Sequence, residues 1–330
     1  MSSPNLDDIE VAIKKSGYLL EQRICHPIAL QKYTLFPNDQ YEDDETGKSR
    51  EIDLVAEKSC WIEAGKSEVL IETHLVIDAK TNPYPVVLFL NEDGFHDPAI
   101  PCISYPETLK YVAKRINKRF SVGSEGPYDF YLGIHGFNQP FMKYKPAFQY
   151  GLLKPEKPSS KADSKWSIRH DDLYDSFTGI VKAMHYHKGA CYNIGKQHSS
   201  ISKNRSISCF LIYPLVIFSG DVFTCKVSND GKLDIKKAKD VFLYKRHSSK
   251  TIRDVFPIFV ITEKDIESFL KNVDTNFKIA IDITTNMYFN GKGKVRPQGS
   301  IEDGLKEIFA EPSNRKRKSS RRQRKTGKDN

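Results

Sequence analysis

The first regular pattern in the chain is a run of apolar residues at helical spacing. Between residues 8 and 24 they recur at intervals of four and seven, which places them on one face of a helix. Gly17 interrupts the run, and glycine destabilises a helix interior by roughly 1 kcal/mol relative to alanine. The pattern therefore predicts a helix in two pieces, with Glu21 beside its apolar face. That face consists of Ile9, Ile13, Leu20 and Ile24.

A pattern with a period of two follows. Residues 51 to 58 alternate apolar and polar positions, which is typical of a half-buried strand, and a second apolar run leads to Asp78. The polar segment 63 to 68 between them is typical of a turn. We therefore expect an antiparallel hairpin that brings Asp53 and Asp78 toward the same end of a sheet.

The rest of the chain alternates strands with helices, which favours an α/β fold. We interpret residues 91–165 as an inserted lobe that ends in a loop at 151–165. The predicted elements are strands at 86–90, 207–218, 221–226, 241–244 and 254–261, and helices at 106–119, 171–187 and 263–272. The turn at 229–231 is expected to join the strands at 221–226 and 241–244, and Thr262 is expected to cap the helix at 263–272.

An ordered set of polar residues marks the ends of the first two strands. Glu21 lies in the early helix, Arg50-Glu51-Ile52-Asp53 opens the first strand after an acidic loop at 39–45, and Asp78-Ala79-Lys80 ends the second. This set, over residues 15 to 90, resembles the PD-(D/E)xK nuclease superfamily. It departs from the family in one respect, because the second acid is more often Glu and the shorter Asp78 reaches less far toward a metal.

The resemblance implies a restriction-endonuclease-like fold, in which a mixed central sheet is flanked by helices. Residues 1–90 would form the motif-bearing part of the core, 91–165 the inserted lobe, 166–313 the remainder of the core, and 314–330 a disordered basic tail. It also implies a nuclease that hydrolyses nucleic acid, DNA more readily than RNA, in microbial defence or restriction. A structure-selective repair nuclease and a non-catalytic nucleic-acid-binding or assembly module remain alternatives.

The residue types specify the expected chemistry. Asp53, Asp78 and the backbone carbonyl of Ala79 offer hard oxygen ligands, which suit Mg2+ or Mn2+ rather than zinc. Lys80 would orient the attacking water and neutralise charge on the phosphate, and Glu21 would hold a second metal or a metal-bound water. In the alternative interpretation, Asp78 and Lys80 form an ion pair at the sheet edge and Glu21 lies on a solvated helix face.

The net charge of +9 is concentrated at one end. Residues 314–330 carry nine Lys or Arg and one acid, which leaves only +1 for the rest of the chain. A segment of this composition cannot bury a core, so we expect a disordered arm that follows phosphates, or else a localisation or solubilising tail. Its expected nucleic-acid contacts are Arg315, Lys316, Arg317, Lys318, Arg321, Arg322, Arg324 and Lys325.

Several other classes of protein are not favoured by the sequence. The sequence has no run of eighteen apolar residues, so we expect no membrane span. The N-terminus lacks a signal-peptide pattern, so we expect a cytoplasmic protein with reduced cysteines. His185 and His187 with Cys191 do not favour zinc, because residues two apart on a helix point away from each other. A homodimer or a partner subunit is left open.

Overall fold

The computed structural model describes residues 4–64, 67–91, 102–104, 139–141, 143–156, 166–170, 173–201, 205–239, 241–289 and 293–297. The helix expected at 106–119 and the basic tail at 314–330 lie outside the described residues.

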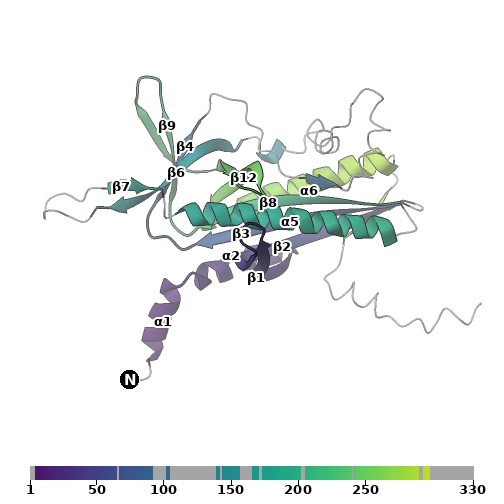
Figure 1. The fold of residues 1–330 in the computed structure, drawn as a ribbon, viewed down its shortest axis with the longest axis horizontal. Helices are drawn as coiled ribbons and strands as arrows, with labels where there is room; N and C mark the ends of the chain where they lie inside the picture. The colour runs from purple at the N-terminus through teal and green to yellow at the C-terminus, as the bar shows by residue number, and fades with distance from the viewer. Residues whose placement is uncertain are drawn as a thin grey trace, which may run out of the picture.

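A mixed sheet of 13 strands forms the centre of the molecule (Figure 1). In spatial order its path is β1 (Thr34–Asp43), β2 (Lys48–Ala64), β3 (Ser67–Lys80), β8 (Arg205–Phe218), β12 (Arg253–Thr262), β11 (Val241–Ser248), β6 (Lys145–Pro155), β4 (Val86–Leu90), β9 (Val222–Val227) and β10 (Leu233–Lys237). Three short strands lie off this path: β13 (Lys294–Pro297) pairs with β2, β5 (Cys102–Ser104) with β8, and β7 (Trp166–Arg169) with β6.

Parallel and antiparallel pairs coexist in this sheet. Strands β2 and β3 form an antiparallel hairpin, whereas β3, β8 and β12 run parallel to one another. The β3–β8 ladder extends from Ser67 opposite Arg205 to Lys80 opposite Phe218, and Phe218 is in turn opposite Thr262. The carboxyl ends of three neighbouring strands therefore meet at one edge, which is where open α/β sheets commonly bind ligands.

Helices cover both faces of the sheet. The long α5 (Tyr174–Ile201) packs on one face, and α2 (Tyr18–Leu30) and α6 (Ile266–Phe289) pack on the other. The N-terminal α1 (Leu6–Lys15) projects away from the body of the molecule (Figure 1). Single turns of 3-10 helix, η1 (Gln139–Phe141) and η3 (Glu263–Asp265), complete the described elements.

Alternation along the strands separates the two halves of the core. In β3, Leu75 and Ile77 contact the side covered by α2 and α6, whereas Val76 between them contacts the side covered by α5. All three are fully buried. Successive strand residues point to opposite faces, so a strand buried on both sides must be apolar at every position, as this run is.

The expectations from the sequence are confirmed for the central elements. The strands expected at 51–58, 69–80 and 207–218 are neighbours in one mixed sheet, and the early helix is divided at Gly17. The helix expected at 171–187 is present as α5 and continues to Ile201.

Four local expectations were wrong. The acidic segment 39–45 is largely strand, because residues 39–43 belong to β1. The turn at 229–231 joins β9 to β10 rather than to β11. The loop expected from residue 151 begins later, since β6 continues to Pro155. Thr262 precedes η3 and makes no capping hydrogen bond with its side chain; its hydroxyl donates instead to the carboxylate of Asp265 at 2.6 Å.

Within the residues that the structure describes, no helix is both long and apolar enough to cross a membrane.

Candidate functional site

A break in strand geometry positions Asp53. On β1, Pro37 is opposite Leu54 and Asp39 is opposite Ile52, while Asn38 between them adopts a positive φ of 53°. Asparagine tolerates this region better than most residues. In a regular strand, residues two apart point to the same face of the sheet. Ile52 and Leu54 instead pack in the hydrophobic clusters on opposite sides of the sheet. The irregularity turns the intervening Asp53 out of the regular alternation.

Asp53 reaches across to the end of β3. Its Oδ2 accepts a hydrogen bond of 2.6 Å from the backbone N–H of Ala79. The backbone pairing of β2 with β3 ends at Leu54 and Ile77. The Asp53 side chain therefore accepts the hydrogen bond of Ala79 just beyond the last paired residues. A strand residue directs its N–H and C=O to the same neighbour, so the carbonyl of Ala79 is expected on the β2 side of β3 as well.

Lys80 joins the two carboxylates. Its Nζ lies 2.7 Å from Oδ1 of Asp78 and 3.9 Å from Oδ2 of Asp53. The exposed fraction of the side chain rises from 9% for Asp78 through 22% for Asp53 to 36% for Lys80. The cluster is therefore buried at Asp78 and open to solvent at the ammonium group.

The ionised form of Asp78 is unfavourable in this setting. Burial is the largest influence and raises the pKa of its carboxyl to about 7; attraction to Lys80 opposes the shift, and the neighbouring Asp53 adds to it. Asp78 Oδ2 is buried and has no hydrogen-bond partner among the described residues. At Lys80 the balance is reversed, because attraction to Asp78, Asp53 and Glu21 outweighs burial and raises the pKa of its ammonium group.

Glu21 lies near the same cluster from the other direction. It is in the first turn of α2, beside Gly17, where a Cβ atom would lie 3.4 Å from Glu21 Oε1. Burial, followed by repulsion from Asp53 and Glu51, raises the pKa of the Glu21 carboxyl, whereas Lys80 lowers it. The structure thus brings Asp53, Asp78 and Lys80 into contact, and Glu21 interacts electrostatically with Asp53 and Lys80. These are the four side chains expected from the sequence.

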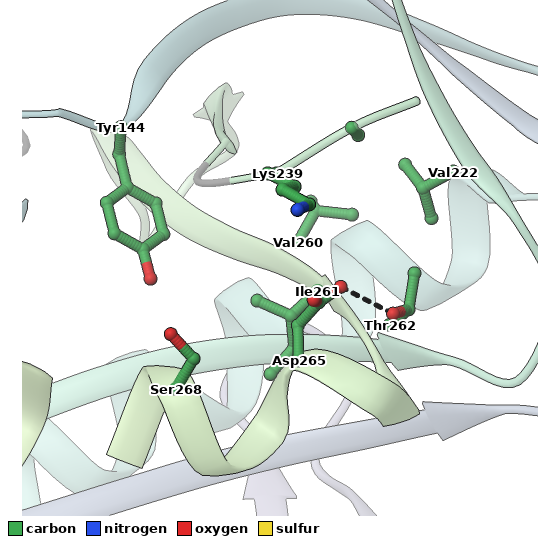
Figure 2. A pocket seen from close by; sticks show the side chains of 9 residues that line it. Tyr144, Val222, Lys239, Val260, Ile261, Thr262, Asp265 and Ser268 are labelled. Carbon is green, nitrogen blue, oxygen red and sulfur yellow. Dashed lines mark hydrogen bonds between the residues drawn. The ribbon is translucent and has the colours of Figure 1, made fainter. Parts of the chain in front are cut away.

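A pocket of about 250 Å3 lies farther along the same sheet edge (Figure 2). Thr262 at the end of β12 and Asp265 in η3 line it, two strands away from β3. Helix α2 is tied to this region by a bidentate contact from Arg23 to Glu263, with distances of 2.5 and 3.0 Å. The pocket adds a polar recess beside the cluster but contains none of its four residues.

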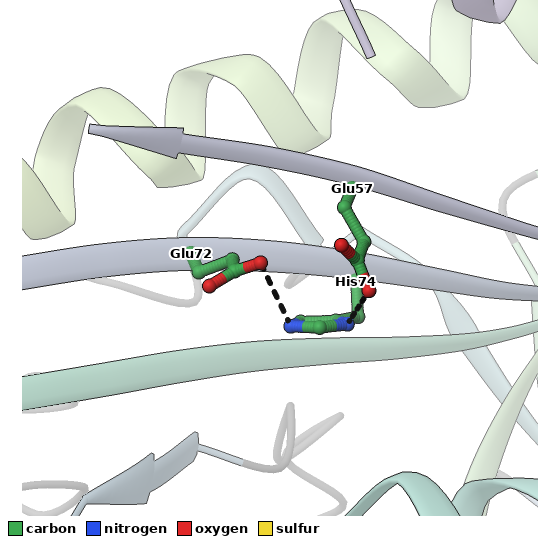
Figure 3. A group of neighbouring side chains, drawn as sticks. All are labelled: Glu57, Glu72 and His74. Atoms are coloured by element: carbon green, nitrogen blue, oxygen red, sulfur yellow. Dashed lines mark ion pairs between the residues drawn. The ribbon is translucent and has the colours of Figure 1, made fainter. Parts of the chain in front are cut away.

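The sequence did not indicate a second polar cluster inside the sheet. Glu57 on β2 lies beside Glu72 and His74 on β3 (Figure 3). The alternation of charged residues in these strands was the available signal, but it is also the pattern of a strand with one face in solvent. The eight basic residues expected to contact nucleic acid lie in the tail, outside the described residues.

Neither protein-family models, nor curated proteins, nor solved structures give a match to this chain.

Proposed function

We propose that this protein is a divalent-metal-dependent nuclease of the PD-(D/E)xK type that hydrolyses phosphodiester bonds, with DNA as its preferred substrate. The restriction-endonuclease-like core and a role in microbial defence belong to the same proposal. The observation that carries it is the convergence of Asp53, Asp78 and Lys80 at the end of the β2–β3 hairpin.

The donor set fits Mg2+ or Mn2+. Among the described residues no hydrogen-bond donor reaches the buried Oδ2 of Asp78. Asp53 supplies a second carboxylate, and the backbone carbonyl of Ala79 would be a third ligand. These are hard oxygen ligands, and a cation beside them would relieve the repulsion that disfavours ionised Asp78. When bound, such an ion lowers the pKa of a coordinated water and stabilises negative charge on the scissile phosphate.

The protein's own groups would position the reactants. Asp78 holds the Lys80 ammonium at 2.7 Å, while about a third of the Lys80 side chain remains exposed. Its remaining N–H groups can donate to an attacking water or to a phosphate oxygen that arrives from solvent. Glu21, whose raised pKa favours proton uptake, would accept a proton from a water on the α2 side.

The net charge supports a nucleic-acid substrate. The nine basic residues of 314–330 would attract phosphates independently of base sequence. Deleting this segment is expected to weaken binding and to flatten the dependence of log K on log salt, with the melting temperature unchanged. A large drop in melting temperature would contradict its role as a separate binding arm.

The decisive test is cleavage by the purified protein. Plasmid, linear duplex, single-stranded DNA and RNA would be incubated with Mg2+ and with a chelator. We expect Mg2+-dependent cleavage, and Asp78→Asn should abolish it while nucleic-acid binding persists, because the carboxylate acts on the transition state. Asp234→Asn is a matched control, since Asp234 also precedes a lysine by two residues but lies on exposed β10.

Metal binding can be followed apart from turnover. Mg2+ should raise the melting temperature of the wild-type protein by mass action. Asp78→Asn should remove that shift and Lys80→Met should keep it, because only the carboxylate is a ligand. Binding of nucleic acid without cleavage in any metal would identify a non-catalytic module, and cleavage that survives both substitutions would overturn the site assignment.

A further inference from the structure

The second polar cluster lies within the sheet, beneath α5. Glu57 and His74 are cross-strand neighbours on β2 and β3, and Glu72 shares the same face of β3 (Figure 3). His74 Nδ1 lies 3.2 Å from Glu57 Oε1, and His74 Nε2 lies 3.5 Å from Glu72 Oε1. One imidazole is therefore held between two carboxylates.

Helix α5 closes the cluster from above. Cys191 Sγ lies 3.6 Å from His74 Nε2, and His187 is one helical turn earlier on the same face. Both side chains are buried, and His187 Nε2 faces Asp39 Oδ2 on β1 at 3.4 Å. His185, by contrast, turns away to Asp44 on the β1–β2 connection.

Hydrogen bonding within the protein leaves this cluster incompletely satisfied. His74 is only 3% exposed, and within the described part of the chain its Nδ1 makes no aligned hydrogen bond despite the 3.2 Å contact with Glu57. Buried polar groups are normally hydrogen-bonded, and a bound ion would give the His74 ring the aligned partner that its Nδ1 lacks among the described residues.

A metal ion matches the spacing of the donor atoms. One donor atom each from Glu57, Glu72 and His74 can be chosen so that all three lie within 4.8 Å of one another. Oxygen and nitrogen ligands at about 2.0–2.2 Å from one ion are separated by roughly 3–4 Å. Because Glu57 and Glu72 face opposite ring nitrogens of His74, one carboxylate would move to the nitrogen that binds the ion. The 31% exposed Glu57 side chain provides a route from solvent.

We propose that Glu57, Glu72 and His74 form a second metal site that binds a divalent transition metal ion, with Zn2+ as its representative. A nitrogen donor between carboxylates favours such ions over Mg2+, which prefers oxygen ligands and retained water. The site is separate from the cleavage site, because the four residue steps along β2 from Asp53 to Glu57 span about 13 Å. A bound ion would cross-link β2 to β3 beneath α5.

The test uses the full-length protein stripped of metal by a chelator. We expect one Zn2+ per chain by elemental analysis, a higher melting temperature on Zn2+ addition, and visible d–d absorption when Co2+ is added instead. His74→Gln and the nearly isosteric Glu72→Gln should each weaken Zn2+ binding by at least about 100-fold, because each removes a ligand.

Two matched variants complete the design. His170→Gln alters an exposed histidine, and Asp78→Asn alters the proposed cleavage site; both should bind Zn2+ as the wild type does. Should His74→Gln fail to fold, Glu72→Gln answers the same question. Absence of Co2+ absorption in the wild type, or equal Zn2+ affinity in Glu72→Gln, would overturn the proposal whether or not the protein cleaves nucleic acid.

Discussion

Two of the four Asp-x-Lys sequences in this chain show that the pattern has different meanings in different surroundings. Asp78-Ala79-Lys80 ends β3, and Asp234-Ile235-Lys236 lies in β10. Both form ion pairs, of 2.7 Å and 2.6 Å. The Asp and Lys side chains are 9% and 36% exposed in the first pair and 55% and 69% exposed in the second.

The difference lies in depth and in neighbours. Asp78 ends a strand buried on both faces and meets a second acid from an adjacent strand, whereas β10 lies at the sheet edge with every residue exposed. Desolvation and a neighbouring like charge disfavour an ionised carboxylate, so a bound cation stabilises it strongly. An exposed ion pair contributes little to stability, and its carboxylate is already solvated by water.

The largest expected contrast is in catalysis. Lys80→Met should lower kcat/KM for cleavage by about 1000-fold, a loss typical of removing a group that stabilises transition-state charge. Lys236→Met should leave kcat/KM unchanged. Steady-state cleavage of a labelled duplex measures both, and equal activity in the two variants would show that the β3 pair has no catalytic role.

A stability contrast comes next. Lys182 on α5 binds Asp43 at 3.0 Å and Glu45 at 2.7 Å, and the Asp43 side chain is fully buried. Lys182→Met should lower the free energy of unfolding by about 2 kcal/mol. This is less than the roughly 3–5 kcal/mol lost when a buried pair is fully broken, because Arg50 remains 3.5 Å from Asp43. Lys236→Met should leave the urea midpoint nearly unchanged. Equal midpoints would mean that the Asp43–Lys182 pair is not desolvated.

The third acid distinguishes the two pairs further. Glu21 acts electrostatically on Lys80 and Asp53. Glu21→Gln should reduce kcat by about 100-fold without changing the melting temperature, which is the lower end of the usual loss when a general base is removed. Glu10→Gln on the projecting α1 is the control. A pH–rate profile that is unchanged in Glu21→Gln would remove Glu21 from the mechanism.

The smallest effect is a pH-dependent shift in stability. Because the pKa of Asp78 is raised from 3.8 to about 7, the folded state retains a proton that the unfolded state releases. Stability should therefore fall as pH rises from about 4 to 7. Without divalent metal, Asp78→Asn should raise the melting temperature at pH 8 by roughly 2–4 °C and leave it unchanged near pH 4. Asp234→Asn should be neutral at both values.

Local periodicity was sufficient to predict the hairpin and its acidic end. The alternation at 51–58 and the apolar run before Asp78 are properties of a few adjacent residues. By contrast, β10 was missed because all five of its residues are exposed, so it has no apolar face to recognise. The contact between His74 and Cys191 joins residues 117 positions apart, and no local pattern encodes it.

The parallel ladder between β3 and β8 has a consequence for synthesis of the protein on the ribosome. Residues 67–80 of β3 pair with residues 205–218, which are translated much later. At a synthesis rate of 5–20 residues per second, β8 is translated on the order of ten seconds after β3. During that interval the nascent hairpin presents an apolar, unpaired strand. Its yield in cells should therefore depend on chaperone supply and on translation speed across residues 81–204.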